Sequence, residues 1–240
     1  KQLRDFCWEM ITKFRSNDPK NDFINNMKGK LGEEVVKTRL DEFVTEVDYK
    51  KRKGGDGKVD FTLTSDSSVG IQVKARHGNF DQIQWFISQD EIEKNTVLVC
   101  ILIQEEVSEA QPEYNLILAG FLPTDMITVT GGKASVRINE LLYAGALHGY
   151  LDDLISSKVD EYIQLAEKCF NRENYESGIA HCNQALRLKP NNADAYNGRG
   201  TCRHKLGDIQ SAIDEIIPKL STLTPILLKL TRIGGLLALH

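Results

Sequence analysis

The stretch GDGKVDFTLTSDSSVGIQVKA, residues 55–75, decides the fold of the first half of this 240-residue chain. Two apolar, β-branched runs follow a glycine-rich turn and are separated by the polar turn SDSS, a pattern typical of a β-hairpin. Side chains two residues apart on a strand point to the same face. We therefore expect Gln72 and Lys74 to share a face, Val73 to point to the other, and Asp60 on the paired strand to lie beside them.

The segments around this hairpin predict an α/β domain over residues 1–150 with one central sheet. The run 96–103 is continuously apolar and largely β-branched, which favours a strand buried on both faces. The order helix, three strands, helix, strand is that of an α/β layout. Helices are expected at 2–15, 22–42 and 80–94, and strands at 43–49, 59–64, 69–75, 96–103 and 115–121.

The second half of the chain is helical in pattern up to about residue 216 and contains a repeat. Small and apolar residues recur in a unit of about 34 residues that starts near Val159 and ends at Pro190, and a second copy begins at Ala193. Residues 155–216 resemble the tetratricopeptide repeat (TPR), a helix–turn–helix unit; the alternative is a generic helical hairpin. The resemblance implies an all-α region of two repeats that recruits a protein or peptide partner or mediates self-association.

Residues 217–240 break this pattern, because they contain eight leucines, three isoleucines and no acidic residue. A reading frame shifted by one nucleotide can restore repeat-like residues at the positions of residues 224–226, 230–231 and 233–235. Our hypothesis is that this apolar tail is a frame-shifted third repeat, and the alternative is a genuine apolar capping helix.

The residues of the first half that carry chemistry are oxygen donors and one lysine. Cleavage of a phosphodiester needs an activated water and neutralisation of charge, and Mg²⁺ supplies both through hard oxygen ligands. Asp60 would be the principal metal carboxylate, with the amide oxygen of Gln72, the backbone carbonyl of Val73 and the helix carboxylate of Glu33 as further donors. Lys74 would orient or deprotonate the attacking water, or stabilise the developing negative charge.

These motifs resemble the PD-(D/E)xK nuclease superfamily, especially its Mrr-like restriction-endonuclease group, over about residues 25–122. The resemblance implies a restriction-endonuclease-like core, a central mixed sheet flanked by helices, with Asp60, Gln72 and Lys74 as active-site residues and Glu33 as the helix carboxylate. The chain departs from the family pattern at Val59, where the name pattern has proline, and at Gln72, which replaces the acid and lowers the negative charge at the metal. Glu34, about 100° further round the helix, is the alternative to Glu33.

The formal net charge of −4 excludes a wholly basic nucleic-acid coat protein, but the charge is unevenly distributed. Segment 50–76 holds seven basic and three acidic residues, a local net charge of +4. Its lysine run at 50–53 could follow phosphates or be a solvated loop, and Asp56 is either a turn former or an accessory metal ligand. Trp85 could touch nucleic acid or lie in the core. The predicted nucleic-acid-binding residues are Lys50, Lys51, Arg52, Lys53, Lys58 and Arg76.

Together these patterns predict a Mg²⁺-dependent endonuclease, with Mn²⁺ as a substitute metal, fused to TPR repeats. By analogy with the resembled group, DNA is the expected substrate, RNA is not excluded, and the role is restriction or defence. Cleavage of both strands would favour a homodimer. The alternatives are a catalytically degenerate fold that binds nucleic acid or serves as a TPR scaffold, and a structure-specific repair nuclease.

The cysteines and the apolar runs bear on the cellular compartment. The five cysteines are scattered and form no CxxC pair, which is typical of reduced thiols in the cytoplasm. The sequence contains neither a signal-peptide layout nor a run of about 18 apolar residues, so we expect no membrane insertion.

Overall fold

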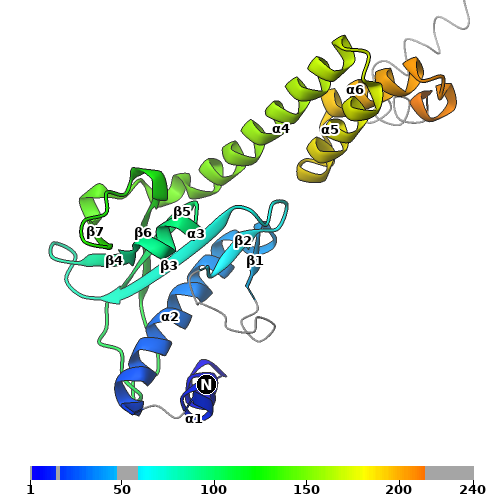
Figure 1. Cartoon of the computed structure of the whole chain (residues 1–240). Coiled ribbons are helices and arrows are strands. Elements are labelled where there is room, and N and C mark those ends of the chain that lie inside the picture. Colours follow the sequence, from blue (N-terminus) through cyan, green and yellow to red (C-terminus); the bar gives the residue numbers. More distant parts are fainter. Residues whose placement is uncertain (1, 15–16, 48–58, 214–240) are drawn as a thin grey trace, which may run out of the picture. The chain divides into compact units, whose positions relative to one another are not determined.

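A computed structural model describes residues 2–14, 17–47 and 59–213, with the side chain of Phe14 excepted. The chain divides into two compact units, residues 1–151 and 152–240 (Figure 1). The predicted tail 217–240 lies outside the described residues, as do the predicted phosphate contacts at 50–53 and Lys58.

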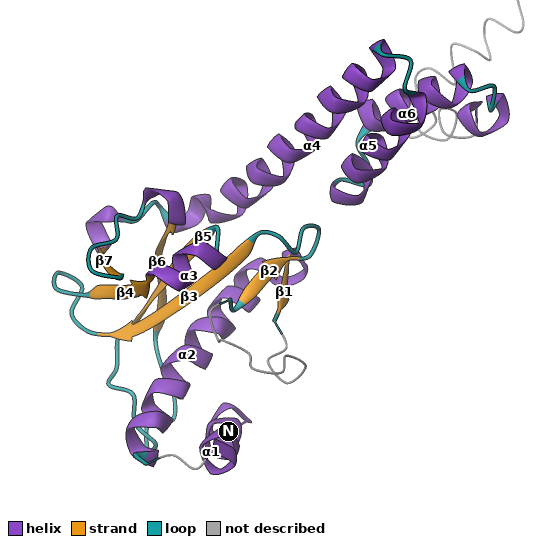
Figure 2. Ribbon diagram, in the orientation of Figure 1, coloured by secondary structure: helices purple, strands orange, loops and turns teal. Residues whose placement is uncertain are grey.

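The first unit is an α/β domain built on a mixed sheet, as predicted. Its central sheet has the strand order β1-β2-β3-β5-β6, in which β3 and β5 are parallel and the other neighbours antiparallel. Strands β4 and β7 form a separate antiparallel pair (Figure 2). The elements are α1 (Gln2–Phe14), α2 (Pro19–Leu40), β1 (Val44–Glu46), β2 (Phe61–Leu63), β3 (Gly70–His77), β4 (Gln84–Ser88), α3 (Gln89–Lys94), β5 (Val97–Ile103), β6 (Leu116–Pro123) and β7 (Lys133–Arg137), with short 3₁₀ turns.

Strand β5 lies at the centre of the core, and all seven of its residues are buried. Its register with β3 pairs Gln72 with Leu98 and Lys74 with Cys100. Leu98 and Cys100 belong to a buried cluster with side chains of β4 and β7. Gln72 and Lys74 therefore share the face of the sheet that these strands cover, as the two-residue period of a strand requires.

The predicted helix at 80–94 is wrong for its central part, because residues 84–88 form β4 and only 89–94 form α3. In β4, Trp85 and Ile87 are buried and Phe86 between them is half exposed, which is the alternation of a strand. The indole N–H of Trp85 donates to the carbonyl of Ile101 at 3.1 Å. Trp85 is thus a core residue rather than a nucleic-acid contact.

Helix α2 covers the opposite face of the central sheet. It begins after Asp18, whose side chain accepts a hydrogen bond from the backbone N–H of Asn21, and Pro19 follows the cap. At Gly32 the helix approaches β3 so closely that an added Cβ would lie 2.7 Å from the Cβ of Ala75. Gly32 therefore has a packing function, and its close approach brings the next residue, Glu33, to the sheet.

The second unit is helical, with α4 (Leu147–Asn171), α5 (Tyr175–Leu188) and α6 (Ala193–Lys205). Asn174 and Asn192 cap α5 and α6 through side-chain oxygens that accept backbone N–H bonds. Small residues let the helices approach, since a Cβ on Gly178 would lie 2.9 Å from Sγ of Cys202. None of the described helices is both long and apolar enough to cross a membrane.

We predict that Gly32→Ala destabilises the first unit, because its Cβ would also lie 3.2 Å from Cγ1 of Val73. Overpacking of this kind costs about 1–3 kcal/mol. Gly29→Ala, in the same helix, is the matched control: its Cβ would meet nothing within 4 Å, so alanine should stabilise α2 by up to about 1 kcal/mol. Urea denaturation followed by circular dichroism measures both free energies, and equal effects would contradict the close approach.

Candidate active site

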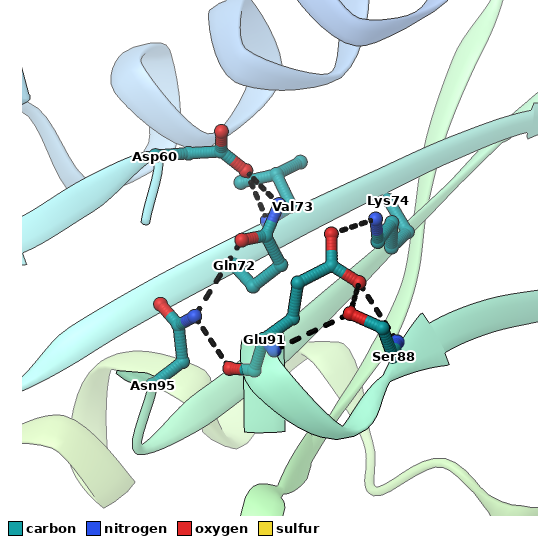
Figure 3. A network of polar contacts seen from close by, with 7 residues as sticks. All are labelled: Asp60, Gln72, Val73, Lys74, Ser88, Glu91 and Asn95. Carbon is teal, nitrogen blue, oxygen red and sulfur yellow. Dashed lines mark hydrogen bonds and ion pairs between the residues drawn. The ribbon is translucent and has the colours of Figure 1, made fainter. Parts of the chain in front are cut away.

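The carboxylate of Asp60 is held against β3 by two short hydrogen bonds. Its Oδ2 accepts from Nε2 of Gln72 and from the backbone N–H of Val73, both at 2.7 Å (Figure 3). Asp60 is buried, with 7% of its surface exposed. A buried carboxylate requires such donors, because its loss of hydration is otherwise not compensated.

The backbone around Asp60 explains why its side chain lies there. Its N–H donates to the carbonyl of Ile71 on β3, and its carbonyl accepts from the N–H of Val47, directly after β1. Asp60 precedes β2, whose pairing with β3 reaches only to Ile71. Beyond Ile71, β3 has no pairing with β2. There the N–H of Val73 donates to the carboxylate of Asp60 instead of to the backbone of a neighbouring strand. The hairpin predicted from the sequence thus brings Asp60 to Gln72 and Val73.

The amide of Gln72 presents its nitrogen, not its oxygen, to Asp60. Its oxygen faces Nδ2 of Asn95 at 3.5 Å, and the same Nδ2 donates to the carbonyl of Glu91 at 2.7 Å. This orientation is the favourable one without a cation, because an amide oxygen beside the carboxylate would be repelled. A metal bound by both residues would require the amide to turn by about 180°.

Lys74 is paired with a residue that the sequence analysis did not single out, Glu91 at the start of α3. Nζ of Lys74 lies 2.6 Å from Oε1 of Glu91, and Oε2 accepts from N and Oγ of Ser88 in a capping box. Burial acts to raise the pKa of Glu91, but the hydrogen bonds from Lys74 and Ser88 outweigh it and hold the pKa below its ordinary value. Glu91 is therefore a carboxylate that forms a partly buried ion pair with Lys74.

Glu33 lies on α2 in a pocket of about 650 Å³ that is also lined by Lys30, Glu46 and Phe61. Burial raises the pKa of Glu33 to about 7, against the attraction of its ion-pair partner Lys30. The charges of Asp60 and Glu46 raise this pKa further. Glu33 and Asp60 are therefore close enough for their charges to interact, whereas the alternative residue, Glu34, is exposed.

The donor set fits magnesium by its chemistry, although the described residues contain no group of three or more His, Cys, Asp or Glu that could hold a metal. Mg²⁺ prefers hard oxygens, binds few protein carboxylates and keeps several waters. The N–H and C=O of one strand residue face the same side, so the carbonyl of Val73 faces the same side of β3 as the N–H bound to Asp60. Asp60, Gln72, Val73 and Glu33 thus supply two carboxylates and two neutral oxygens.

The remaining predictions concern the nucleic-acid contacts and the accessory metal ligand Asp56. Arg76 is exposed on β3, two residues beyond Lys74, while the segment 50–58 with Asp56 lies outside the described residues. Glu91 and Asn95 were not among the predicted site residues. A local signal existed for Glu91, because Ser88-x-x-Glu91 is the pattern of a capping box, but it does not reveal the pairing with Lys74.

Comparison with known families identifies one repeat in the helical region. The family model for the tetratricopeptide repeat matches residues 181–214, which include α6 and the latter part of α5. This supports the TPR prediction and, with it, a role in protein–protein interaction. The comparisons with curated proteins and with solved structures gave no match.

We predict that Glu33 makes the stability of the first unit fall with rising pH. Its pKa is about 7 in the folded protein and 4.5 in the unfolded chain, so between these values the folded state holds a proton that the unfolded chain has released. The free energy of unfolding should therefore decrease from about pH 4.5 to pH 7. Glu33→Gln cannot ionise and should remove about 1–3 kcal/mol of this decrease.

Urea denaturation in EDTA across this pH range measures the effect, with Glu34→Gln as the matched control. Glu34→Gln should keep the wild-type pH dependence. A wild-type pH dependence in Glu33→Gln would show that burial does not raise the pKa of Glu33 in the folded protein.

Proposed function

We propose that the first unit is a metal-dependent endonuclease that hydrolyses DNA phosphodiester bonds, with RNA as the alternative substrate. The observation that supports it best is the contact of the Asp60 carboxylate with Gln72 and with the peptide N–H of Val73, on the strand that also carries Lys74. The element order and the mixed sheet support the same proposal, because they agree with the resemblance to the PD-(D/E)xK superfamily.

Each residue of the site has a proposed task. Mg²⁺ would be held by Asp60, Gln72, the Val73 carbonyl and Glu33, and when bound it would lower the pKa of a water and neutralise phosphate charge. Lys74 would act as a fixed cation for the phosphate and the developing negative charge. Its ion pair with Glu91, at 2.6 Å, supports this task because it holds the side chain of Lys74 in one position.

The restriction or defence role, the homodimer and the recruitment of a protein partner by the TPR region belong to the same proposal. Cleavage of both strands at one place requires two active sites, which a symmetric dimer would supply. A structure-specific repair nuclease would instead show a preference for nicked or branched DNA.

We expect Lys74→Ala to lose at least about 10²-fold in cleavage rate, because it removes a charge that stabilises the transition state. Linear, nicked and branched DNA and single-stranded RNA, each with Mg²⁺ or Mn²⁺, would be followed on denaturing gels. Lys133→Ala, which removes an exposed lysine of β7, is the matched control and should cleave like wild type. If wild type cleaves none of these substrates, or Lys74→Ala cleaves equally well, the enzyme proposal fails and the non-catalytic alternative is favoured.

For the second unit we propose binding of an extended, basic peptide. A pocket of about 480 Å³ lies between α4 and α6. Its lining combines apolar side chains with two carboxylates, Glu167 and Asp194, and two amides, Asn171 and Asn197. Carboxylates attract basic side chains, and amides can bond the peptide backbone without regard to its sequence.

We predict that Glu167→Lys weakens peptide binding at least about tenfold, the effect expected when a like charge replaces an attractive one at an interface. Fluorescence polarisation of a panel of unstructured peptides with graded net charge is the measurement, and affinity should rise with positive charge. Glu161→Lys, an exposed position of the same helix outside the pocket, is the control. An affinity that does not change with peptide charge, or an equal loss of affinity in both variants, would contradict the proposed peptide-binding pocket.

A further inference from the structure

The carboxyl end of β3 opens into a second polar pocket. It has a volume of about 440 Å³ and combines a guanidinium, an imidazole, amide side chains and an aromatic ring. Pockets of this size take small ligands or single groups of a larger one. Its lining includes Arg76, His77, Asn79, Gln82, Gln84 and Phe86.

Arg76 and Phe86 form a flat, exposed platform in this pocket. The guanidinium carbon of Arg76 lies 4.8 Å from the ring centroid of Phe86, a cation–π arrangement, and Nη1 donates to the carbonyl of Gln84 at 2.9 Å. The ring nevertheless keeps 50% of its surface exposed. The Phe86 ring is thus exposed but fixed in position by its contact with Arg76. Another planar group can stack on such a ring.

The amides of the pocket can add hydrogen bonds to a planar polar group. The amide oxygen of Gln84 accepts from Oγ of Ser135 at 2.7 Å, which leaves its NH₂ group as the donor toward a ligand. Asn79 and Gln82 are exposed and offer both donors and acceptors. The combination of a stacking ring and adaptable amides suits the polar edges of a nucleobase.

The pocket continues the face of the candidate active site. Gln72, Lys74 and Arg76 alternate along β3 and pair in order with Leu98, Cys100 and Leu102 of β5, so all three lie on one face. Successive residues of this row are about 6.6 Å apart along the strand. A polynucleotide that places a phosphate at Lys74 can therefore reach Arg76 and Phe86 with its neighbouring nucleotide.

We propose that the Arg76–Phe86 pocket receives an unpaired nucleobase next to the cleaved phosphate, and that single-stranded nucleic acid is preferred there over duplex. An unpaired base can leave its stack and lie on the Phe86 ring without the cost of breaking a base pair. The proposed path of the nucleic acid past Lys74 rests on the proposed nuclease function, whereas the pocket itself is tested by binding alone.

The charges around the pocket indicate that stacking, rather than net charge, dominates. Arg76 contributes a permanent positive charge, and His77 lies on the same strand. Against them stand Asp81 in the following loop and Glu105, whose pKa is lowered mainly by hydrogen bonds from Asn115 and also by the charge of His77. Because acidic residues offset the charge of Arg76, the salt dependence of binding through this pocket should be shallow compared with that of a phosphate-tracking groove.

The test is fluorescence anisotropy of a labelled oligothymidylate of about 12 nucleotides and of a duplex of the same length, with the full chain in EDTA so that no cleavage occurs. Phe86→Ala should weaken single-strand binding at least about fivefold, the low end of the loss of one base–aromatic stack, while Phe86→Tyr should bind like wild type. Phe80→Ala is the matched control, because Phe80 is similarly exposed, at 58%, but does not line the pocket. Circular dichroism would establish that each variant is folded.

Preferential binding of the duplex, no loss in Phe86→Ala, or an equal loss in Phe80→Ala would overturn the assignment. The result is separable from the fate of the nuclease proposal. Binding that depends on Phe86, without cleavage in Mg²⁺, would support the pocket proposal and contradict the nuclease proposal. Cleavage with binding that does not depend on Phe86 would support the nuclease proposal and contradict the pocket proposal.

Discussion

The architecture of the first unit depends on hydrogen bonds to the buried carboxylate of Asp60, at the point where the pairing of β2 with β3 ends. Asp60 takes the place of a strand there, because its Oδ2 binds the N–H of Val73 as well as the amide of Gln72. Its position also lets its charge interact with that of Glu33 on α2, although Gln72 lies on the face of the sheet that α2 does not cover. Asp60 is thus the point at which groups from both faces meet, and it has a structural role as well as a proposed catalytic one. Its removal would leave an N–H and an amide without their acceptor, so loss of activity in an Asp60 variant would not by itself show catalysis.

Helix α3 connects the two residues of the Gln-x-Lys motif although it is only six residues long. Its Glu91 side chain binds Lys74, and its Glu91 carbonyl binds Asn95, whose amide also faces Gln72. The same carboxylate completes the capping box with Ser88, so the start of the helix and the position of the lysine are coupled. A carboxylate that is fixed at both oxygens holds Lys74 in one place more firmly than an exposed ion pair could, because little side-chain freedom remains to be lost.

The parts of this arrangement that follow from local periodicity were predictable, and those that follow from packing were not. The continuous apolar run of β5 and the turns that flank β2 and β3 can be recognised in the sequence. The two-residue period of β3 correctly places Gln72 and Lys74 on the same face of the sheet. The alternation of burial in β4 is not visible in its sequence, because Trp85, Phe86 and Ile87 are all apolar. So short an apolar run cannot be distinguished from a helical segment. The pairing of Lys74 with Glu91 joins residues 17 positions apart, and it depends on where α3 packs, which no local pattern encodes.

Gln72 has a consequence for the balance between folding and metal binding. An acid at this position would lie within hydrogen-bond distance of the Asp60 carboxylate, and two such groups cannot both be ionised without a cation between them. The amide removes that repulsion and donates to Asp60, so the fold satisfies its buried carboxylate without a metal. For the proposed Mg²⁺, Gln72 would supply one negative charge fewer than an acid, and its amide would have to turn away from Asn95 before its oxygen could face Asp60. The site therefore favours a stable metal-free fold over tight metal binding, and the contact between substrate and the fixed charge of Lys74 would have to contribute more to assembling the reactive complex.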